Sequence, residues 1–307
     1  MQVPASLRRQ GFIADQPPAA SQRSFPDGAD FRIEIPSVEG PRMLEAVLAE
    51  ADRYDVTINR VAQGGGGLLL EESELRDMAQ MGADAGLEIS LFTGPKAGHD
   101  TGVTTRTADG RGHAHSVRGM RQLSYAVADI LRATEAGIRG FLVADIGLLT
   151  ILVEMQREGE LPEETVWKIS TYLSGYNPAS LRVLAGMGAG TINIPSDISL
   201  GELFEMRSAV SLPIDLYLET PDDGGRIMRG HEIADFVTVG APLYAKFGLS
   251  NAPGLYPSGR QVLDIGVASA REKVRRAAIA LEWMRRDRPD AVQSKPHANG
   301  LGVPVPS

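Results

Sequence analysis

The 307-residue sequence contains no cysteine. Disulfides, a thiolate nucleophile, a zinc–thiolate site and a cysteine-ligated iron–sulfur cluster are therefore excluded. Positive charge is also scarce, because 31 Lys and Arg residues stand against 39 Asp and Glu residues and give a net charge of −8. An acidic chain is a poor ligand for nucleic acid or for an anionic membrane surface, so neither is expected as a partner.

Long hydrophobic runs are missing as well. The most apolar window, GFLVADIGLLTILVEM, is interrupted by Asp145 and is shorter than a membrane span. The segment MQVPASLRRQGFIADQPPAASQRSFPDG lacks the apolar core of a signal peptide. These absences favour a soluble protein of the cytoplasm.

Short apolar runs are present and recur along the chain, mostly about every 25 residues, with amphipathic stretches between them. They begin near Phe31, Val56, Leu87, Phe141, Val166, Thr191, Ile214 and Phe236. Repeated strand–helix units form parallel sheets, and eight units close into a (β/α)₈ barrel. We therefore predict a single-domain α/β protein whose TIM barrel spans residues 31–288.

The segments outside this rhythm are rich in small and turn-forming residues. Residues 1–30 are predicted to form a flexible arm, and residues 289–307, rich in Pro, Gly and Ala, a disordered tail. A long patternless insertion, residues 96–118, follows the third run. Such a segment over the carboxyl face is expected to be a lid, the alternative being a mobile surface loop without a role. His113 and His115 within it fall short of a metal site by themselves.

Strand alternation predicts which polar side chains face the barrel axis. The inward set is Arg32, Glu34, Thr57, Asn59, Glu88, Ser90, Phe92, Lys168, Ser170, Tyr172, Asn193, Asp215, Tyr217 and Glu219, and Lys246 follows the eighth run. Buried charges need partners, so we expect an ion pair between Arg32 and Asp215 low in the barrel. Charged residues nearer the strand ends are expected to be functional.

Four polar residues are candidate catalytic groups, three of them from this inward set and Asp145 from the end of the fourth run, whose alternation is ambiguous. Glu34, Asp145 and Glu219 lie at predicted strand ends, where a carboxylate acts as a general base or the three together hold a divalent metal. The cofactor is unknown, and a divalent metal is one candidate. Lys168 could form a Schiff base if burial removes its proton, or it could simply neutralise Glu34 or Asp215. The candidate substrate-binding residues are Asn59, Gln63, Ser170, Tyr172, Asn193, Tyr217 and Lys246.

Three segments carry a family resemblance: FRIEIPSVEGPRMLEAVLAEA, KISTYLSGYNPASLRVLAGMGAGTINIPSDISL and APLYAKFGLSNAPGLYPSG. There the chain resembles the collagenase-like peptidases of unassigned mechanism (U-type), as a divergent cysteine-free member. The resemblance spans roughly residues 31–286 and implies a barrel with peptidase-like activity, but it assigns no site residue. Some members of that family hold a cysteine-ligated iron–sulfur cluster used in hydroxylation, which a chain without cysteine cannot do.

Our first hypothesis is a barrel hydrolase acting on a small polar or peptide-like substrate with help from carboxylates. The second is a Schiff-base lyase or aldolase that uses Lys168. The third is a non-catalytic binding or scaffold subunit. For each of them we expect a homo-oligomer.

Overall fold

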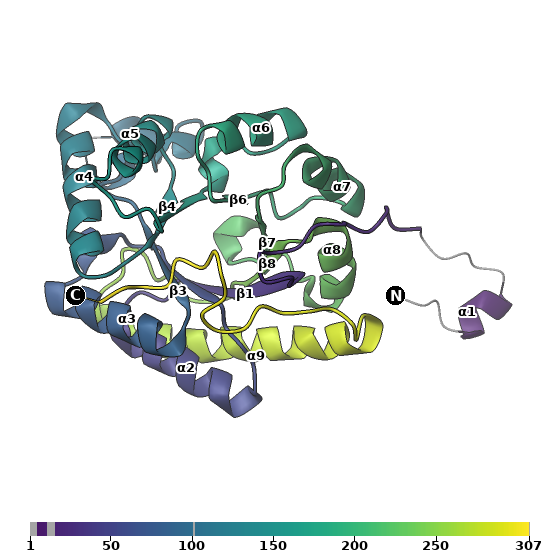
Figure 1. Ribbon diagram of the computed structural model, residues 1–307. Helices are drawn as coiled ribbons and strands as arrows, with labels where there is room; N and C mark the ends of the chain where they lie inside the picture. Colours follow the sequence, from purple (N-terminus) through teal and green to yellow (C-terminus); the bar gives the residue numbers. More distant parts are fainter. Residues whose placement is uncertain (1–4, 11–15, 101, 307) are drawn as a thin grey trace.

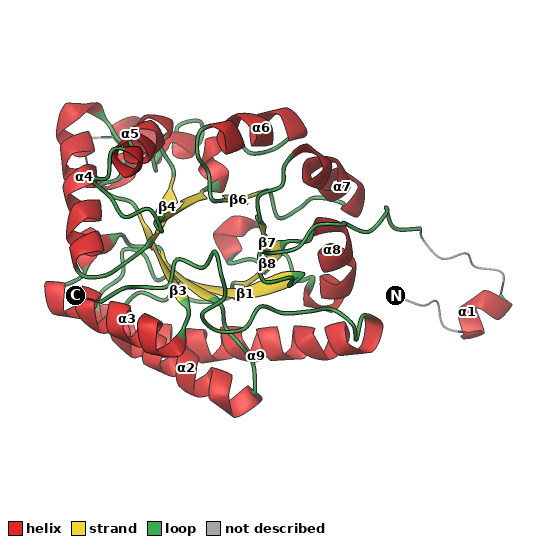
Figure 2. Ribbon diagram, in the orientation of Figure 1, coloured by secondary structure: helices red, strands yellow, loops and turns green. Residues whose placement is uncertain are grey.

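The computed structural model describes residues 5–10, 16–100 and 102–306. Eight parallel strands form a closed barrel in the order β1 to β8, with each strand paired to its neighbours in sequence and β8 paired to β1. Figure 2 shows the ring of yellow strands enclosed by red helices. The strands are β1 (Phe31–Pro36), β2 (Arg60–Gln63), β3 (Glu88–Phe92), β4 (Gly140–Val143), β5 (Val166–Ile169), β6 (Thr191–Asn193), β7 (Ile214–Glu219) and β8 (Leu243–Phe247). The predicted TIM barrel is confirmed.

Eight of the described helices cover the outside of the barrel, whereas α1 (Ala5–Arg9) lies apart from it and buries no residue (Figure 1). The eight are α2 (Pro41–Tyr54), α3 (Glu72–Ala85), α4 (Gly119–Glu135), α5 (Ile146–Arg157), α6 (Pro178–Gly186), α7 (Leu200–Ala209), α8 (Ile233–Gly240) and α9 (Leu263–Asp287). Side-chain caps fix where several of them begin, because they satisfy free N–H groups of the first turn. Asn177 and Ser199 form capping boxes on α6 and α7, and Asp145 caps α5. None of the described helices is long and apolar enough to cross a membrane.

Two of the predicted strands are displaced. The apolar run at Phe236 belongs to helix α8, and the eighth strand begins at Leu243. A short, fully buried helix is apolar all round, so periodicity alone does not distinguish it from a buried strand. The second strand begins at Arg60 rather than at Val56. Residues 56–59 precede the strand, so their alternation does not continue into β2, where Arg60 and Ala62 face the axis in register with Glu34 and Ser90.

The tail after α9 packs against the amino-terminal end of the barrel. In Figure 1 the yellow segment crosses the ring of strands. Its Ser294 hydroxyl and the carbonyls of Asn299 and Gly300 accept hydrogen bonds from the Arg32 guanidinium, and Gly302 N–H donates to Glu88. The disordered tail predicted for 289–307 is therefore wrong for the described residues 289–306. Composition did not reveal that buried groups at the end of the barrel supply their hydrogen-bond partners.

The arm before β1 is also partly attached. Ser21 donates its hydroxyl to the carbonyl of Ala241, and Phe25 is buried against the ring of Tyr244. The Arg32 guanidinium lies 4.0 Å from the centre of the Phe25 ring. Much of the predicted flexible arm, 1–4 and 11–15, lies outside the described residues, but 21–30 belong to the packed structure.

The insertion 96–118 forms three short 3₁₀ helices, η2 (Ala97–His99), η3 (Val103–Arg106) and η4 (Arg111–His113). Both of its ends are anchored. Lys96 is buried and donates to the carbonyl of Gly64, and Val117 N–H donates to the Asp145 carboxylate. The segment thus leaves β3 and joins α4 at the carboxyl end of the barrel.

Candidate functional site

The inward side chains form layers of four, each contributed by alternate strands. Strand register, advanced by about one residue per strand for the tilt, places one layer on β1, β3, β5 and β7. We call Glu34, Ser90, Lys168 and Asp215 the central layer. The upper layer, toward the carboxyl ends, is Ala62, Leu142, Asn193 and Lys246, and the lower layer is Arg60, Gly140, Thr191 and Tyr244. The contacts between inward side chains agree with these layers.

Glu34 is the hub of the central layer. Both of its carboxylate oxygens lie 2.5 Å from Nζ of Lys168, on the far side of the barrel. Lys246 Nζ lies 3.4 Å from Glu34 and also donates to the side-chain oxygen of Asn193. The Nζ atom of Lys246 also lies over the Tyr217 ring, 4.1 Å from the centre of the ring. Sequence analysis predicted all five as site residues, and the structure brings them together.

Arg60 joins the lower layer to the central one. Its guanidinium contacts Glu34 at 3.1 Å, Asp215 at 2.7 Å and Glu88 at 2.8 Å. Asp215 also accepts a hydrogen bond from Thr191. Asp215 is therefore the partner of Arg60, and the predicted Arg32–Asp215 pair is wrong. Arg32 lies lower and donates to neutral oxygens.

Three cations (Arg60, Lys168 and Lys246) and three carboxylates (Glu34, Glu88 and Asp215) thus form one buried network. Burial by itself raises the pKa of Glu34, but Lys168, Lys246 and Arg60 lower it well below its ordinary value. Burial is the largest influence on Lys168 and lowers its pKa; Glu34 raises it and Lys246 lowers it again, to about 7. An amine with this pKa is available as a neutral nucleophile near neutral pH.

Solvent reaches the upper layer and stops there. Leu142, although it faces the axis from the middle of β4, is partly exposed, as is Tyr217 on β7. Lys246 in the upper layer is 3% exposed, whereas Lys168 and Glu34 in the central layer are 0% exposed. Solvent therefore contacts Leu142, one layer above Lys168, but not Lys168 itself.

An aromatic stack covers part of the mouth, the carboxyl end of the barrel. The His115 ring, from the insertion, lies between Phe92 at the end of β3 and Tyr172 after β5, with ring centres 5.3 and 3.8 Å away. Burial, Lys96 and His99 lower the pKa of His115 to about 4, so the ring is neutral. The insertion is thereby held over the carboxyl end of the barrel; whether it opens as a lid stays a prediction.

A second set of contacts between loops at the carboxyl end of the barrel is centred on Glu39. Its carboxylate accepts hydrogen bonds from Gly64 N–H, Gly65 N–H, the Tyr256 hydroxyl and the Ser258 hydroxyl, at 2.8–2.9 Å. A Cβ on Gly64 would lie 2.2 Å from the Tyr256 oxygen. The glycine loop after β2 is thus close-packed under the loop after β8, and these two amides are already occupied.

Two predicted catalytic carboxylates stand apart from the central layer. Asp145 caps α5 through Leu148 N–H and holds the insertion through Val117 N–H. Glu219 follows an irregularity in β7 that pairs it with Phe247, so the alternation reverses and the side chain leaves the axis. Glu219 accepts from Ser250 N–H and lies 3.8 Å from Arg276. No group of three metal-ligating side chains occurs among the described residues, so Glu34, Asp145 and Glu219 do not form one.

Three predicted substrate-binding residues have structural partners. Asn59 precedes β2 and joins Ile33 N–H to the carbonyl of Ser294, which places it at the closed amino-terminal end of the barrel. Gln63 bonds the backbone of Gly66, and the Ser170 hydroxyl caps a turn at Tyr172. Tyr172 lies at the mouth in the aromatic stack.

Sequence reasoning missed Arg60 because Val56 and Ile58 were taken as the start of the second strand and their alternation was extended, whereas residues 56–59 precede β2. Tyr244 was missed with the eighth strand; its ring lies 3.5 Å from the Arg60 guanidinium. The run Asn59-Arg60-Val61 shows no clear apolar alternation, because a buried arginine interrupts it. The pattern therefore does not predict the direction of the Arg60 side chain. The available hint was that four predicted inward carboxylates (Glu34, Glu88, Asp215 and Glu219) outnumbered the three predicted cations, so a further inward cation was required.

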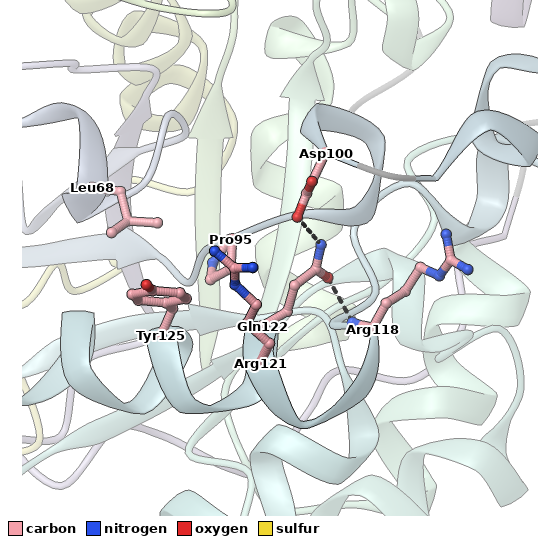
Figure 3. Close-up of a pocket in the computed structure, with 7 residues that line it drawn as sticks. All are labelled: Leu68, Pro95, Asp100, Arg118, Arg121, Gln122 and Tyr125. Atoms are coloured by element: carbon pink, nitrogen blue, oxygen red, sulfur yellow. Dashed lines mark hydrogen bonds between the residues drawn. The ribbon is translucent and has the colours of Figure 1, made fainter.

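Two pockets lie away from the axis. The larger, about 480 Å³, lies between the loop after β2, the insertion and the start of α4 (Figure 3). It is lined by Leu68, Pro95, Asp100, Arg118, Arg121, Gln122 and Tyr125. Gln122 donates to the Asp100 carboxylate and accepts from Arg118 N–H, as the dashed lines in Figure 3 show. A smaller pocket of about 180 Å³ includes Glu219, Arg276 and Trp283.

No protein-family model matches this chain, and no curated protein matches it. Among solved structures, a U32 peptidase is 16% identical, with 67% of this chain and 72% of that chain covered and a TM-score of 0.40. A putative lyase/mutase from Burkholderia cenocepacia J2315 is 16% identical, with 83% and 84% covered and a TM-score of 0.44. Oxaloacetate acetylhydrolase bound to 3,3-difluorooxalacetate is 12% identical, with 85% and 84% covered and a TM-score of 0.46. These similar structures are enzymes of different classes, and the resemblance to peptidases is limited to this distant likeness.

Proposed function

We propose that this protein is a Schiff-base lyase of the aldolase type, with Lys168 as the nucleophile. The observation that carries the proposal is the buried pair of lysines on one carboxylate: Lys168 and Lys246 both contact Glu34, one layer below and beside the partly exposed Leu142. Burial and the second amine lower the pKa of Lys168 to about 7, which leaves much of it uncharged at neutral pH.

The chemistry follows from that protonation state. The lone pair of the neutral Lys168 amine attacks the carbonyl carbon of a substrate, and the carbonyl oxygen takes up two protons and leaves as water. The resulting iminium accepts the electron pair of the adjacent carbon–carbon bond while a β-hydroxyl loses its proton and becomes a carbonyl. Protonation of the enamine and hydrolysis by water then release the second product and restore Lys168. Glu34 provides the negative charge next to the iminium throughout.

The hydrolase hypothesis has less support. A general base near neutral pH needs a raised pKa and a free lone pair. Glu34 has a lowered pKa and contacts three cations, while Glu219 is turned away from the axis and held by Ser250 N–H. The hydrolase would therefore need a carboxylate outside the central layer.

Borohydride trapping tests the proposal. Incubation with a small aldehyde or ketone plus borohydride should add the reduced substrate's mass to Lys168, as read from the tryptic peptide by mass spectrometry. Lys168→Met should abolish the adduct, and Lys295→Met, on the surface of the tail, should leave it unchanged. An adduct that forms elsewhere but not on Lys168, or none with any carbonyl compound, contradicts the proposal and leaves a purely structural charge network.

A further inference from the structure

We propose that the larger pocket described above binds a free amino acid with an apolar side chain, at a site separate from Lys168. Its volume of about 480 Å³ lies within the range of small-molecule pockets, about 300–1,000 Å³. The pocket is bounded by the loop after β2, the insertion and the first turns of α4 (Figure 3). Its walls provide an apolar surface, a cation and an anion, which match the side chain, the carboxylate and the ammonium group of such a ligand.

Apolar side chains form one wall of the pocket. Leu68 is 48% exposed and Tyr125 is 54% exposed, and Pro95 lines the pocket with them. In Figure 3, Leu68 and Tyr125 lie on one side of the pocket and Asp100 lies on the other. The Arg121 guanidinium lies between them. A ligand side chain that covers Leu68 and Tyr125 removes apolar surface from water, which favours binding in proportion to the area covered.

Two opposite charges in the pocket are available to a ligand. The Arg121 side chain forms no ion pair or hydrogen bond with any described residue, and its Cζ atom lies 6.0 Å from the centre of the Tyr125 ring. One oxygen of the Asp100 carboxylate accepts a hydrogen bond from Gln122, and the other has no donor among the described residues. Arg121 and Asp100 line the same pocket without pairing with each other. A ligand carboxylate can therefore bind Arg121 through two N–H groups while a ligand ammonium group donates to Asp100.

The Asp100 carboxylate is held in place before any ligand binds. Gln122 is buried, accepts a hydrogen bond from Arg118 N–H and donates to Asp100, so its amide is fixed at both ends. A site whose polar groups are already ordered loses less conformational entropy on binding. Because Gln122 belongs to α4 and Asp100 to the insertion, a bound ligand contacts both segments.

Ligands with a single charge fit this pocket less well. An anion without an ammonium group places its charge beside Asp100, and a cation without a carboxylate places its charge beside Arg118 and Arg121. A zwitterion pairs with both signs, and its apolar side chain covers the wall formed by Leu68 and Tyr125. The pocket therefore favours an amino acid over its singly charged analogues.

Four compounds test each part of this match. L-phenylalanine carries all three groups, 3-phenylpropionate lacks the ammonium group, phenethylamine lacks the carboxylate and L-alanine lacks the ring. Dissociation constants are measured by NMR titration of the full-length protein at neutral pH. We expect L-phenylalanine to bind most tightly and each of the others about tenfold more weakly, because each lacks one charge-assisted hydrogen bond or the apolar contact.

Substitutions in the pocket should remove this selectivity one group at a time. Arg121→Gln should weaken L-phenylalanine about tenfold and leave phenethylamine no weaker, whereas Asp100→Asn should weaken L-phenylalanine and leave 3-phenylpropionate no weaker. Tyr125→Ala should weaken all three ring compounds. The matched controls are Arg182→Gln on α6 and Tyr176→Ala, two exposed side chains outside the pocket.

The outcomes separate the ligand class from the site itself. Tighter binding of 3-phenylpropionate or phenethylamine than of L-phenylalanine overturns the zwitterionic class. Affinities that ignore both Arg121→Gln and Asp100→Asn, or no saturable binding of any of the four compounds, overturn the site. Lys168→Met should leave the L-phenylalanine affinity unchanged, and a loss of affinity in that variant contradicts a separate site. The result is therefore independent of the lyase proposal.

Discussion

Glu34 contacts Lys168, Lys246 and Arg60, and it shares Arg60 with Glu88 and Asp215. Its influence on the pKa of Lys168 is opposite in sign to that of Lys246, because an opposite charge favours the protonated amine and a like charge disfavours it. The pKa of Lys168 therefore depends on two neighbours that can be removed separately.

Substitutions of Glu34 and Lys246 should shift the pH midpoint of imine formation in opposite directions. In the wild type the trapping rate should rise with pH around a midpoint near 7, because only the neutral amine of Lys168 attacks. Glu34→Gln should lower this midpoint, and Lys246→Met should raise it. Rates are measured from pH 5 to 10 with glycolaldehyde, and circular dichroism confirms folding of each variant. Midpoints that shift in the same direction would contradict the assigned electrostatics.

At the scale of elements, the mouth is built by loops that follow different strands. His115 joins the insertion to the end of β3 and to the segment after β5, and Glu39 joins the loop after β1 to those after β2 and β8. The first junction depends on an uncharged imidazole, since the stack is buried near Lys96. The second depends on a carboxylate that accepts four hydrogen bonds.

The insertion should loosen as the pH falls from 7 to 5. The docked His115 has a pKa of about 4, below the 6.5 of an undocked histidine, so the undocked state binds more protons between these values. The stabilisation of the docked insertion by neutral His115 is therefore complete above pH 6.5 and is lost as the pH falls toward 4. Hydrogen-exchange protection factors for residues 102–114 should fall between pH 7 and pH 5, while His115→Phe should retain the stack and remove the pH dependence. Equal protection at both pH values in the wild type would refute this mechanism.

At the scale of the whole molecule, the tail after α9 and the arm before β1 cover the amino-terminal end of the barrel. The tail crosses the ring of strands and provides three of the oxygens that bind Arg32, and the arm adds the Phe25 ring (Figure 1). The amino-terminal end of the barrel is thus filled by protein, while its carboxyl end is open to solvent at Leu142 and Tyr217.

Removing the tail should destabilise the fold. Deletion of residues 289–307 leaves the Arg32 guanidinium with only the Tyr244 hydroxyl as a hydrogen-bond acceptor. A buried cation stripped of partners costs about 3–5 kcal/mol, and we expect a loss of that order in the free energy of unfolding by urea. Arg32→Met should recover part of the loss in the shortened chain but destabilise the full-length chain. Unchanged stability of the shortened chain would show that the tail is dispensable.

The sequence by itself determined the barrel, its single-domain organisation and the inward direction of Glu34, Lys168, Asn193, Asp215 and Tyr217. Repeated strand–helix spacing and two-residue alternation are local properties of the chain, so they can be recognised in the sequence. Only the tertiary structure decided which inward charges meet. The pairing of Arg60 with Asp215 depends on where β2 begins, and the departure of Glu219 depends on the irregularity in β7. The attachment of the tail depends on groups more than 200 positions away, because hydrogen bonding at the barrel's end is satisfied through space rather than along the chain.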